Sequence, residues 1–349
     1  MSVSIATILG AIVANPVLLL IIVLCLGATV VNGATDAPNA IATVVGTRAM
    51  RPTPAIIMAA VCNFIGLVAI TAVSTAVAST IFGMVDFGGD NHAALVALAA
   101  AMVAIIVWGV AAWALGIPTS QSHSLIAGIT GAAIALQGGL GGINADQWVK
   151  VLYGLVISTG LGFGSGWLFA RLIKIICSGM NRAKTTTFFK WAQIAAGAGV
   201  AVLHGAQDGQ KFLSLCMLAV MLGVYGTPEM SEFPLWMVVL VSLTMSIGTA
   251  VGGRKIIKSV GMSMVKMDHY QGFAACLSAC FCIALATFTG MPVSTTHTKT
   301  TAIMGVGAER RLRAVKWNLA GSMVLTWVLT FPGCGLLAFV FTHLFLLIM

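Results

Sequence analysis

Long apolar runs separated by short polar links follow one another along the whole chain. Four stretches, 53–85, 91–145, 269–298 and 317–349, contain no Asp, Glu, Lys or Arg. A helix needs about 20 consecutive apolar residues to cross a bilayer. The pattern therefore predicts an all-α polytopic membrane protein. Its ten expected membrane segments lie at about 17–47, 53–82, 93–116, 118–137, 149–174, 190–225, 234–253, 270–290, 292–307 and 317–347.

The composition supports a chain that lies in a lipid bilayer. Of the 349 residues, 59% are hydrophobic and 8% are charged, whereas soluble domains carry about 25% charged residues. The net charge of +9 comes from basic links, which the preference for Lys and Arg in cytoplasmic loops explains. Nucleic acid is therefore not an expected partner. The eight cysteines match no standard zinc spacing, so we expect no metal site and no resident cofactor.

The charges of the links predict which side of the membrane each link faces. Basic clusters occur around Arg48 and in 171–190, 254–266 and 309–316, while acidic links occur around Asp86, Asp146 and Glu229. Placing the basic clusters in the cytoplasm puts both termini outside and five segments in each half of the chain. A re-entrant hairpin at 118–137, compensated by a second hairpin elsewhere, satisfies the same charges and stays open as an alternative.

The two halves, 1–185 and 186–349, are then predicted to be repeats of opposite topology. A short polar motif supports this division, because Asn32–Ala40 and His204–Lys211 share the sequence Gly-Ala-x-Asp. Inverted repeats are typical of secondary transporters, whose substrate sites lie near the membrane midplane where broken helices meet. The fold class is thus two inverted repeats with broken helices or re-entrant hairpins at the midplane.

The motif places Asp36 and Asp208 inside long apolar runs. An ionisable side chain at membrane depth costs several kcal/mol and marks a functional site by default. A buried Asp can instead cap a broken helix, but the duplication favours a working site. The runs 17–47 and 190–225 exceed one straight crossing. Unwound backbone is tolerated where it lines a cavity, and we expect helix interruptions at Gly33, Pro38 and Gly209.

A second duplicated motif reads Pro-Thr-Ser-Gln-Ser-His at 118–123 and Pro-Val-Ser-Thr-Thr-His at 292–297. Proline followed by hydroxyl residues is typical of a helix start, and a helix N-terminus attracts anions. Capping and packing alone would be the simpler role of these residues. His123 and His297 either donate to the anion or brace the adjoining backbone, and the second role is slightly favoured. The hydroxyls expected to bind an anion are Thr119, Ser120, Ser122, Ser294, Thr295 and Thr296.

Together, the two motifs predict coupled transport of a small oxyanion. An anion beside Asp36 and Asp208 is repelled unless a cation or proton travels with it, and Lys211 adds a positive charge. Asn39 and Gln207 are expected to complete the coordination. Near neutral pH, phosphate carries an O–H that needs an acceptor, whereas sulfate does not, which favours phosphate over sulfate.

An enzyme is not expected. A hydrolase needs one oriented nucleophile set, while this chain has two equivalent polar sets and no Gly-x-Ser-x-Gly. A passive channel is the remaining alternative, and it would show no accumulation of its substrate against a gradient.

Both motifs resemble the inorganic phosphate transporter (PiT) family, whose duplicated signature reads roughly Gly-Ala-Asn-Asp-x-x-Asn-Ala. The resemblance extends to Gly253–Ile257, Gln271–Ala275 and Lys316–Pro332, and 43–50 and 208–211 look most like the bacterial low-affinity branch. It implies import of inorganic phosphate with H⁺, as free phosphate or as a neutral metal–phosphate complex. It also implies a homodimer in the lipid bilayer of the cell inner (plasma) membrane. Other members of the family use Na⁺, and some bacterial members carry sulfate.

The chain departs from the family signature beside each Asp. Thr35 and Gln207 replace the Asn that precedes Asp, and Gln210-Lys211 replaces Asn-Ala. A fixed ammonium at Lys211 can take the place of a coupling cation, which favours H⁺ over Na⁺. Lys299, in the apolar run after the second hydroxyl motif, has no counterpart in the family that would explain it.

Overall fold

The fold is almost entirely helical, as the sequence predicts. The computed structural model describes residues 3–88, 90–115, 119–227, 229–230, 232–252, 257 and 265–349. Within these residues, seven helices are long and apolar enough to cross a membrane. The helices are α1 (Ile5–Ala14), α2 (Pro16–Thr35), α3 (Ala37–Gly46), α4 (Pro52–Thr71), α5 (Ala76–Phe82), α6 (Asn91–Leu115), α7 (Gln121–Gln137), α8 (Ala145–Ile176), α9 (Arg182–Val220), α10 (Leu235–Gly252), α12 (His269–Phe288), α13 (Thr295–Arg310) and α14 (Trp317–Ile348).

Side-chain caps and prolines set the starts of these helices. Asn144 and Asn181 accept hydrogen bonds from the first backbone N–H groups of α8 and α9. Such a cap satisfies donors that have no partner within the helix. Pro38 stands at the start of α3, because a proline inside a helix loses its N–H and clashes with the carbonyl four residues earlier. The first long run therefore breaks into α2 and α3 at Asp36.

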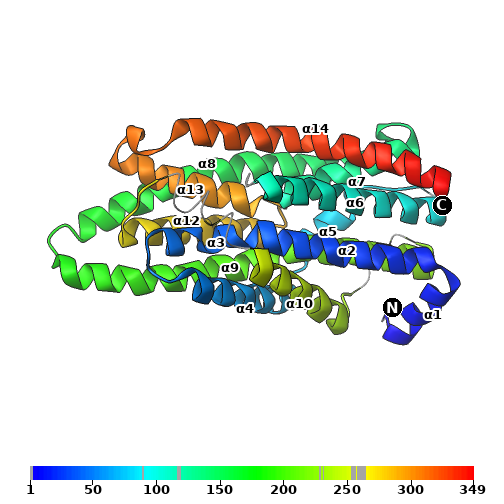
Figure 1. The fold of residues 1–349 in the computed structure, drawn as a ribbon, viewed down its shortest axis with the longest axis horizontal. Helices are drawn as coiled ribbons and strands as arrows, with labels where there is room; N and C mark the ends of the chain where they lie inside the picture. Colours follow the sequence, from blue (N-terminus) through cyan, green and yellow to red (C-terminus); the bar gives the residue numbers. More distant parts are fainter. Residues whose placement is uncertain are drawn as a thin grey trace.

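The charged links gather at two opposite ends of the molecule. The acidic end holds the links around Asp86 and Asp146. There, Val85 pairs with Ile143, and His92 Nε2 lies 3.3 Å from the carbonyl oxygen of Met349. Figure 1 shows both chain termini at this end. At the basic end, Lys174 lies 3.2 Å from Glu309. Arg254, Lys255 and Lys258 of the predicted 254–266 cluster lie outside the described residues.

Two helical hairpins enter the molecule from these opposite ends. Figure 1 shows α6 and α7 in the half toward the acidic end and α12 and α13 in the other half. Their tips meet, since Ser122 Oγ lies 3.4 Å from the carbonyl oxygen of Val293. The rings of His123 and His297 are 4.3 Å apart. Two full crossings would place these tips at opposite membrane surfaces, about 30 Å apart.

The prediction that 118–137 and 292–307 cross the whole membrane is therefore wrong. Helices α7 and α13 have 17 and 16 residues, about 25 Å each at 1.5 Å per residue. Such helices are shorter than the hydrocarbon core of about 30 Å. The structure instead pairs α6 with α7 and α12 with α13. Each pair starts and ends on the same side, so every charged link keeps its predicted side. A hairpin within 118–137, the alternative that the charge pattern left open, does not form, because α7 is one continuous helix.

The motif glycines do not interrupt helices, contrary to the prediction for Gly33 and Gly209. Gly33 lies within α2, and α9 runs without a break through Gly209. A Cβ on Gly33 would lie 2.2 Å from the carbonyl oxygen of Met245 in α10. The equivalent Cβ on Gly205 would lie 2.2 Å from the carbonyl oxygen of Asn63 in α4. These glycines allow close contact between helices of the two halves, and only the break beside Pro38 is confirmed.

The heaviest packing pairs match one another between the halves. Helix α13 packs on α8 as α14 packs on α7, and α4 packs on α9 as α10 packs on α2. The predicted boundary at 185/186 falls in the first turn of α9. The division into two inverted repeats itself stays a prediction.

Candidate functional site

The two acidic motifs and the two hairpin tips meet at one buried site. Asp36 lies at the break between α2 and α3, and Asp208 lies in the middle of α9. Their side chains and that of Lys211 are at most 1% exposed. The hydroxyl motifs that begin α7 and α13 supply their partners, so the site joins four separate parts of the chain.

The first half-site centres on Asp36. Its Oδ1 accepts a hydrogen bond from Thr296 Oγ1 at 2.7 Å, and its Oδ2 accepts one from the backbone N–H of Gln121 at 3.2 Å. Asn39 Nδ2 donates to the same Thr296 Oγ1 at 2.7 Å. Asp36, Thr296 and Asn39 thus form one hydrogen-bonded network, which we call a circuit. It joins a carboxylate, a hydroxyl from the α13 tip and an amide three residues after the carboxylate.

The second half-site repeats this circuit around Asp208. Ser122 Oγ donates to Asp208 Oδ1 at 3.2 Å, and Lys211 Nζ donates to Ser122 Oγ at 2.6 Å. Lys211 Nζ also donates to Asp208 Oδ1 at 2.7 Å and to the carbonyl oxygen of Val293 at 2.6 Å. All three N–H donors of this ammonium are therefore in use. The half-sites differ chiefly in that Lys211 stands where the first has Asn39.

Asp208 has more partners than Asp36. Its Oδ2 accepts from Thr295 Oγ1 at 3.2 Å and from Asn32 Nδ2 at 3.4 Å, and His204 Nδ1 lies 3.2 Å away. In the described part of the chain, no Lys, Arg or His nitrogen lies within ion-pair distance of Asp36. Among the described residues, Asp36 therefore has hydrogen-bond partners only, while Asp208 also has an ammonium partner.

Ser120 and Ser294 cap the helices that begin at the hairpin tips. Their Oγ atoms accept from the backbone N–H groups of His123 and His297 at 3.3 and 3.2 Å. A capping hydroxyl keeps its own hydrogen to donate, so capping and anion binding do not exclude one another here. Thr119 beside the first cap is 5% exposed.

The two histidines form an aromatic column behind the tips. The ring of His297 stacks on Trp327 at 3.6 Å, and the ring of His123 lies 4.5 Å from Phe331. Neither ring nitrogen of His297 has a hydrogen-bond partner among the described residues. These contacts connect the tips to α14 and leave both expected roles of the histidines open.

Gln207 faces away from the two carboxylates. Its Nε2 donates to the carbonyl oxygen of Met291 at 2.7 Å, and its Oε1 accepts from Thr287 Oγ1 at 3.0 Å. Both groups of the amide hold the tip between α12 and α13, whereas we expected them to bind substrate.

Three further buried residues, Asn32, Gln121 and His204, lie at the site and were not predicted from the sequence. Asn32 and His204 each stand four residues before the Asp of their motif copy. This matching position is the sequence signal that could have assigned both residues to the site. Neither amide atom of Gln121 has a partner among the described residues.

A helical membrane protein with carboxylates, hydroxyls and an ammonium enclosed between two hairpin tips has the site of a transporter for a small polar solute. The sequence of the phosphate transporter family matches residues 32–338. The chain belongs to this family. The resemblance found from its motifs is confirmed, and the expectation that the protein is not an enzyme is confirmed with it.

Relatives agree with the family, and one solved structure agrees with the fold. A probable low-affinity inorganic phosphate transporter of Bacillus subtilis (strain 168) is 36% identical over 90% of this chain and 93% of its own length. Another protein of that description, from Rhizobium meliloti (strain 1021), is 35% identical over 95% and 97%. A solved structure described as the sodium-dependent phosphate transporter has a TM-score of 0.87 at 21% identity, covering 96% of this chain and 100% of its own. The last comparison supports the fold.

Proposed function

We propose that the protein is a symporter that imports inorganic phosphate together with H⁺. Membership of the phosphate transporter family and the two half-sites support this proposal. In the structure, Thr296, Ser122 and Lys211 donate hydrogen bonds to the carboxylates. Phosphate oxygens need the same donors. When phosphate takes them, the carboxylates lose their partners at membrane depth, so a proton or cation must neutralise them.

The position of Lys211 Nζ, 2.7 Å from Asp208 Oδ1, is the observation that favours H⁺ over Na⁺. This ammonium occupies the place beside Asp208 that a coupling metal ion would need. Asp36, without a basic partner among the described residues, is then the carboxylate that takes the coupling proton. A carboxylate also accepts the O–H that phosphate carries near neutral pH, which sulfate lacks.

The cellular setting completes the proposal. The protein would work as a homodimer in the cell inner membrane, with both termini outside and the basic end in the cytoplasm. Exposed apolar side chains along α14, among them Val324, Leu325, Val328 and Leu329, can face lipid or a second subunit. The carried species is free phosphate or a neutral metal–phosphate complex, and adding a divalent metal at fixed phosphate concentration distinguishes the two.

Uptake of radiolabelled phosphate into proteoliposomes tests the proposal. A pH gradient alone and a sodium gradient alone are imposed in separate arms, each with and without excess unlabelled sulfate. We expect accumulation driven by the pH gradient and unaffected by sulfate. Accumulation driven only by sodium would replace H⁺ by Na⁺, and inhibition by sulfate would move the substrate to sulfate.

A further inference from the structure

A polar stripe runs along α3 from the site toward the basic end. Asp36, Asn39, Thr43 and Thr47 are spaced so that they share one face of a helix. From the first to the last, the stripe extends about 16 Å at 1.5 Å per residue. Asn39 and Thr43 are nearly or fully buried. Buried polar side chains need hydrogen-bond partners inside the protein, so this face of α3 must contact polar groups of other helices.

Helices α9, α12 and α13 supply partners along the stripe. Thr43 Oγ1 lies 3.1 Å from Cys276 Sγ, and Lys299 Nζ donates to the same sulfur at 3.0 Å. Gln193 Nε2 donates to the carbonyl oxygen of Thr43 at 3.0 Å, and Thr47 Oγ1 donates to Gln193 Oε1 at 3.0 Å. The polar contacts therefore continue from the site to the end of α3.

Lys299, in α13, is the basic group that lies beside this stripe, and its contacts differ from those of Lys211. Lys299 is 1% exposed. Its ammonium has three N–H donors, and among the described residues it donates one hydrogen bond, to Cys276 Sγ. No carboxylate in the described part of the chain lies within ion-pair distance of it. An unpaired buried charge is costly, so an anion that pairs with this ammonium would lower that cost.

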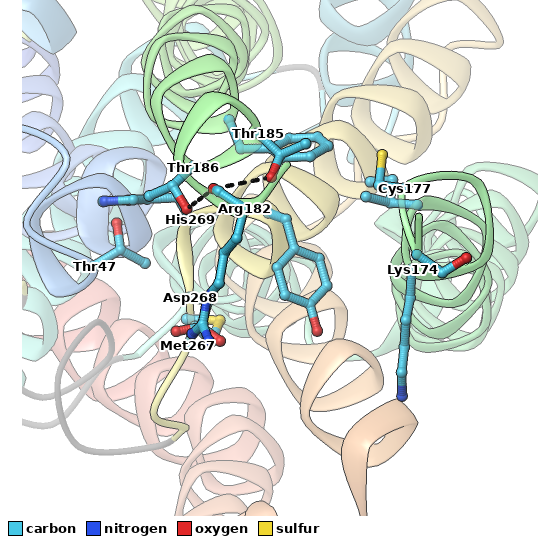
Figure 2. A pocket seen from close by; sticks show the side chains of 13 residues that line it. Thr47, Lys174, Cys177, Arg182, Thr185, Thr186, Met267, Asp268 and His269 are labelled. Carbon is cyan, nitrogen blue, oxygen red and sulfur yellow. Dashed lines mark hydrogen bonds between the residues drawn. The ribbon is translucent and has the colours of Figure 1, made fainter. Parts of the chain in front are cut away.

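The stripe ends at a cavity on the basic end. The cavity has a volume of about 480 Å³ and is lined by Thr47 and by residues of α8, α9 and the start of α12. Figure 2 shows Thr47 on one side of this cavity and Lys174 on the other, with Arg182 and His269 between them. The stripe thus leads from the buried site toward a cavity whose charged lining residues are Lys174, Arg182 and Asp268.

We propose that Lys299 is a second anion station, which phosphate occupies on its way between the central site and the basic end. The inference rests on the proposed phosphate transport. Phosphate that leaves Lys211 must pass through protein at membrane depth. Lys299, with donors to spare and Thr43 beside it, offers the next positive charge along the α3 stripe. When phosphate moves to Lys299, it leaves Lys211 and still has a positively charged partner, so it does not face apolar side chains alone.

Replacement of Lys299 tests the station by its effect on rate. We expect Lys299→Gln to bind phosphate at equilibrium with an affinity within about twofold of wild type but to transport it about tenfold more slowly. Lys299→Arg should restore most of the rate, and Lys184→Gln, an exposed basic-end control, should change neither. Wild-type transport rates in Lys299→Gln, or equal losses of affinity and rate, would overturn the station. Failure of the wild-type protein to transport phosphate would instead overturn the proposed function.

Labelling of Cys276 tests the route without relying on transport rates. In a variant that keeps Cys276 as its one cysteine, a membrane-impermeant thiol reagent is added from one side at a time during turnover. We expect modification from the basic end, slowed several-fold by phosphate. Modification from the acidic end, no modification from either side, or modification indifferent to phosphate would each exclude this route.

Discussion

Replacing Lys211 by the residue of the other half-site should expose a cation site beside Asp208. In Lys211→Asn, the second circuit becomes a copy of the first, in which Asn39 donates to Thr296. At 2.7 Å and an effective dielectric constant of about 20, the lost attraction is ~6 kcal/mol. Removing one partner of a buried ion pair typically costs about 3–5 kcal/mol after relaxation. We therefore expect a clear fall in thermal stability.

Sodium should restore part of that stability, because Na⁺ can now sit where the ammonium was. Binding at a concentration of 100 Kd recovers about 2.7 kcal/mol. The assay compares the unfolding midpoint of purified wild type and Lys211→Asn in sodium chloride and in choline chloride. The expected result is a midpoint that rises more steeply with sodium in the variant, which has two circuits without an ammonium, than in wild type, which has one. An unchanged midpoint in the variant, or an equal sodium response in both proteins, would refute the reasoning.

Three further substitutions separate the roles of neighbouring residues. Asp208→Asn leaves the buried ammonium of Lys211 unpaired, so uptake should be lost and stability should fall by about 3–5 kcal/mol; an Asp208→Asn protein with normal uptake would exclude this carboxylate from the site. Gln207→Leu should lower kcat several-fold with an unchanged KM, because it frees a hairpin tip; a raised KM at constant kcat would show that Gln207 binds substrate. Gly205→Ala should destabilise the protein by about 1–3 kcal/mol, since its Cβ would lie 2.2 Å from a carbonyl oxygen of α4, whereas Gly160→Ala, with open space around it, should not; equal unfolding midpoints for the two alanine variants would contradict the close helix crossing.

The sequence carried enough information to predict which polar residues lie together. The duplicated Asp and hydroxyl motifs were predicted to meet, and Asp36, Asp208, Ser122, Thr296 and Lys211 do lie in two linked circuits. Polar residues in long apolar runs are costly unless they partner one another. Such residues therefore identify their own neighbours even when they lie far apart in the chain.

The sequence could not determine how deep each segment goes or which way each side chain points. Charged links report only the side on which they end, so two re-entrant hairpins were indistinguishable from four crossings. Gly209 resembled a helix break, but its missing side chain serves contact with Leu67, which a Cβ would approach to 2.6 Å. Gln207 precedes Asp208 directly, and its amide donates to the carbonyl oxygen of Met291 rather than to a carboxylate of the site.

Asp36→Asn tests whether Asp36 is the carboxylate that takes the coupling proton. Asparagine mimics a permanently protonated side chain. The variant should therefore lose net uptake, which needs the proton to be released, and keep phosphate exchange, which does not. In proteoliposomes, we expect the Asp36→Asn protein to remain in the membrane and to lose the phosphate accumulation that a pH gradient drives. It should still exchange labelled for unlabelled phosphate at a rate within about tenfold of wild type. Persistent accumulation under the pH gradient, or loss of exchange together with accumulation, would contradict the claim.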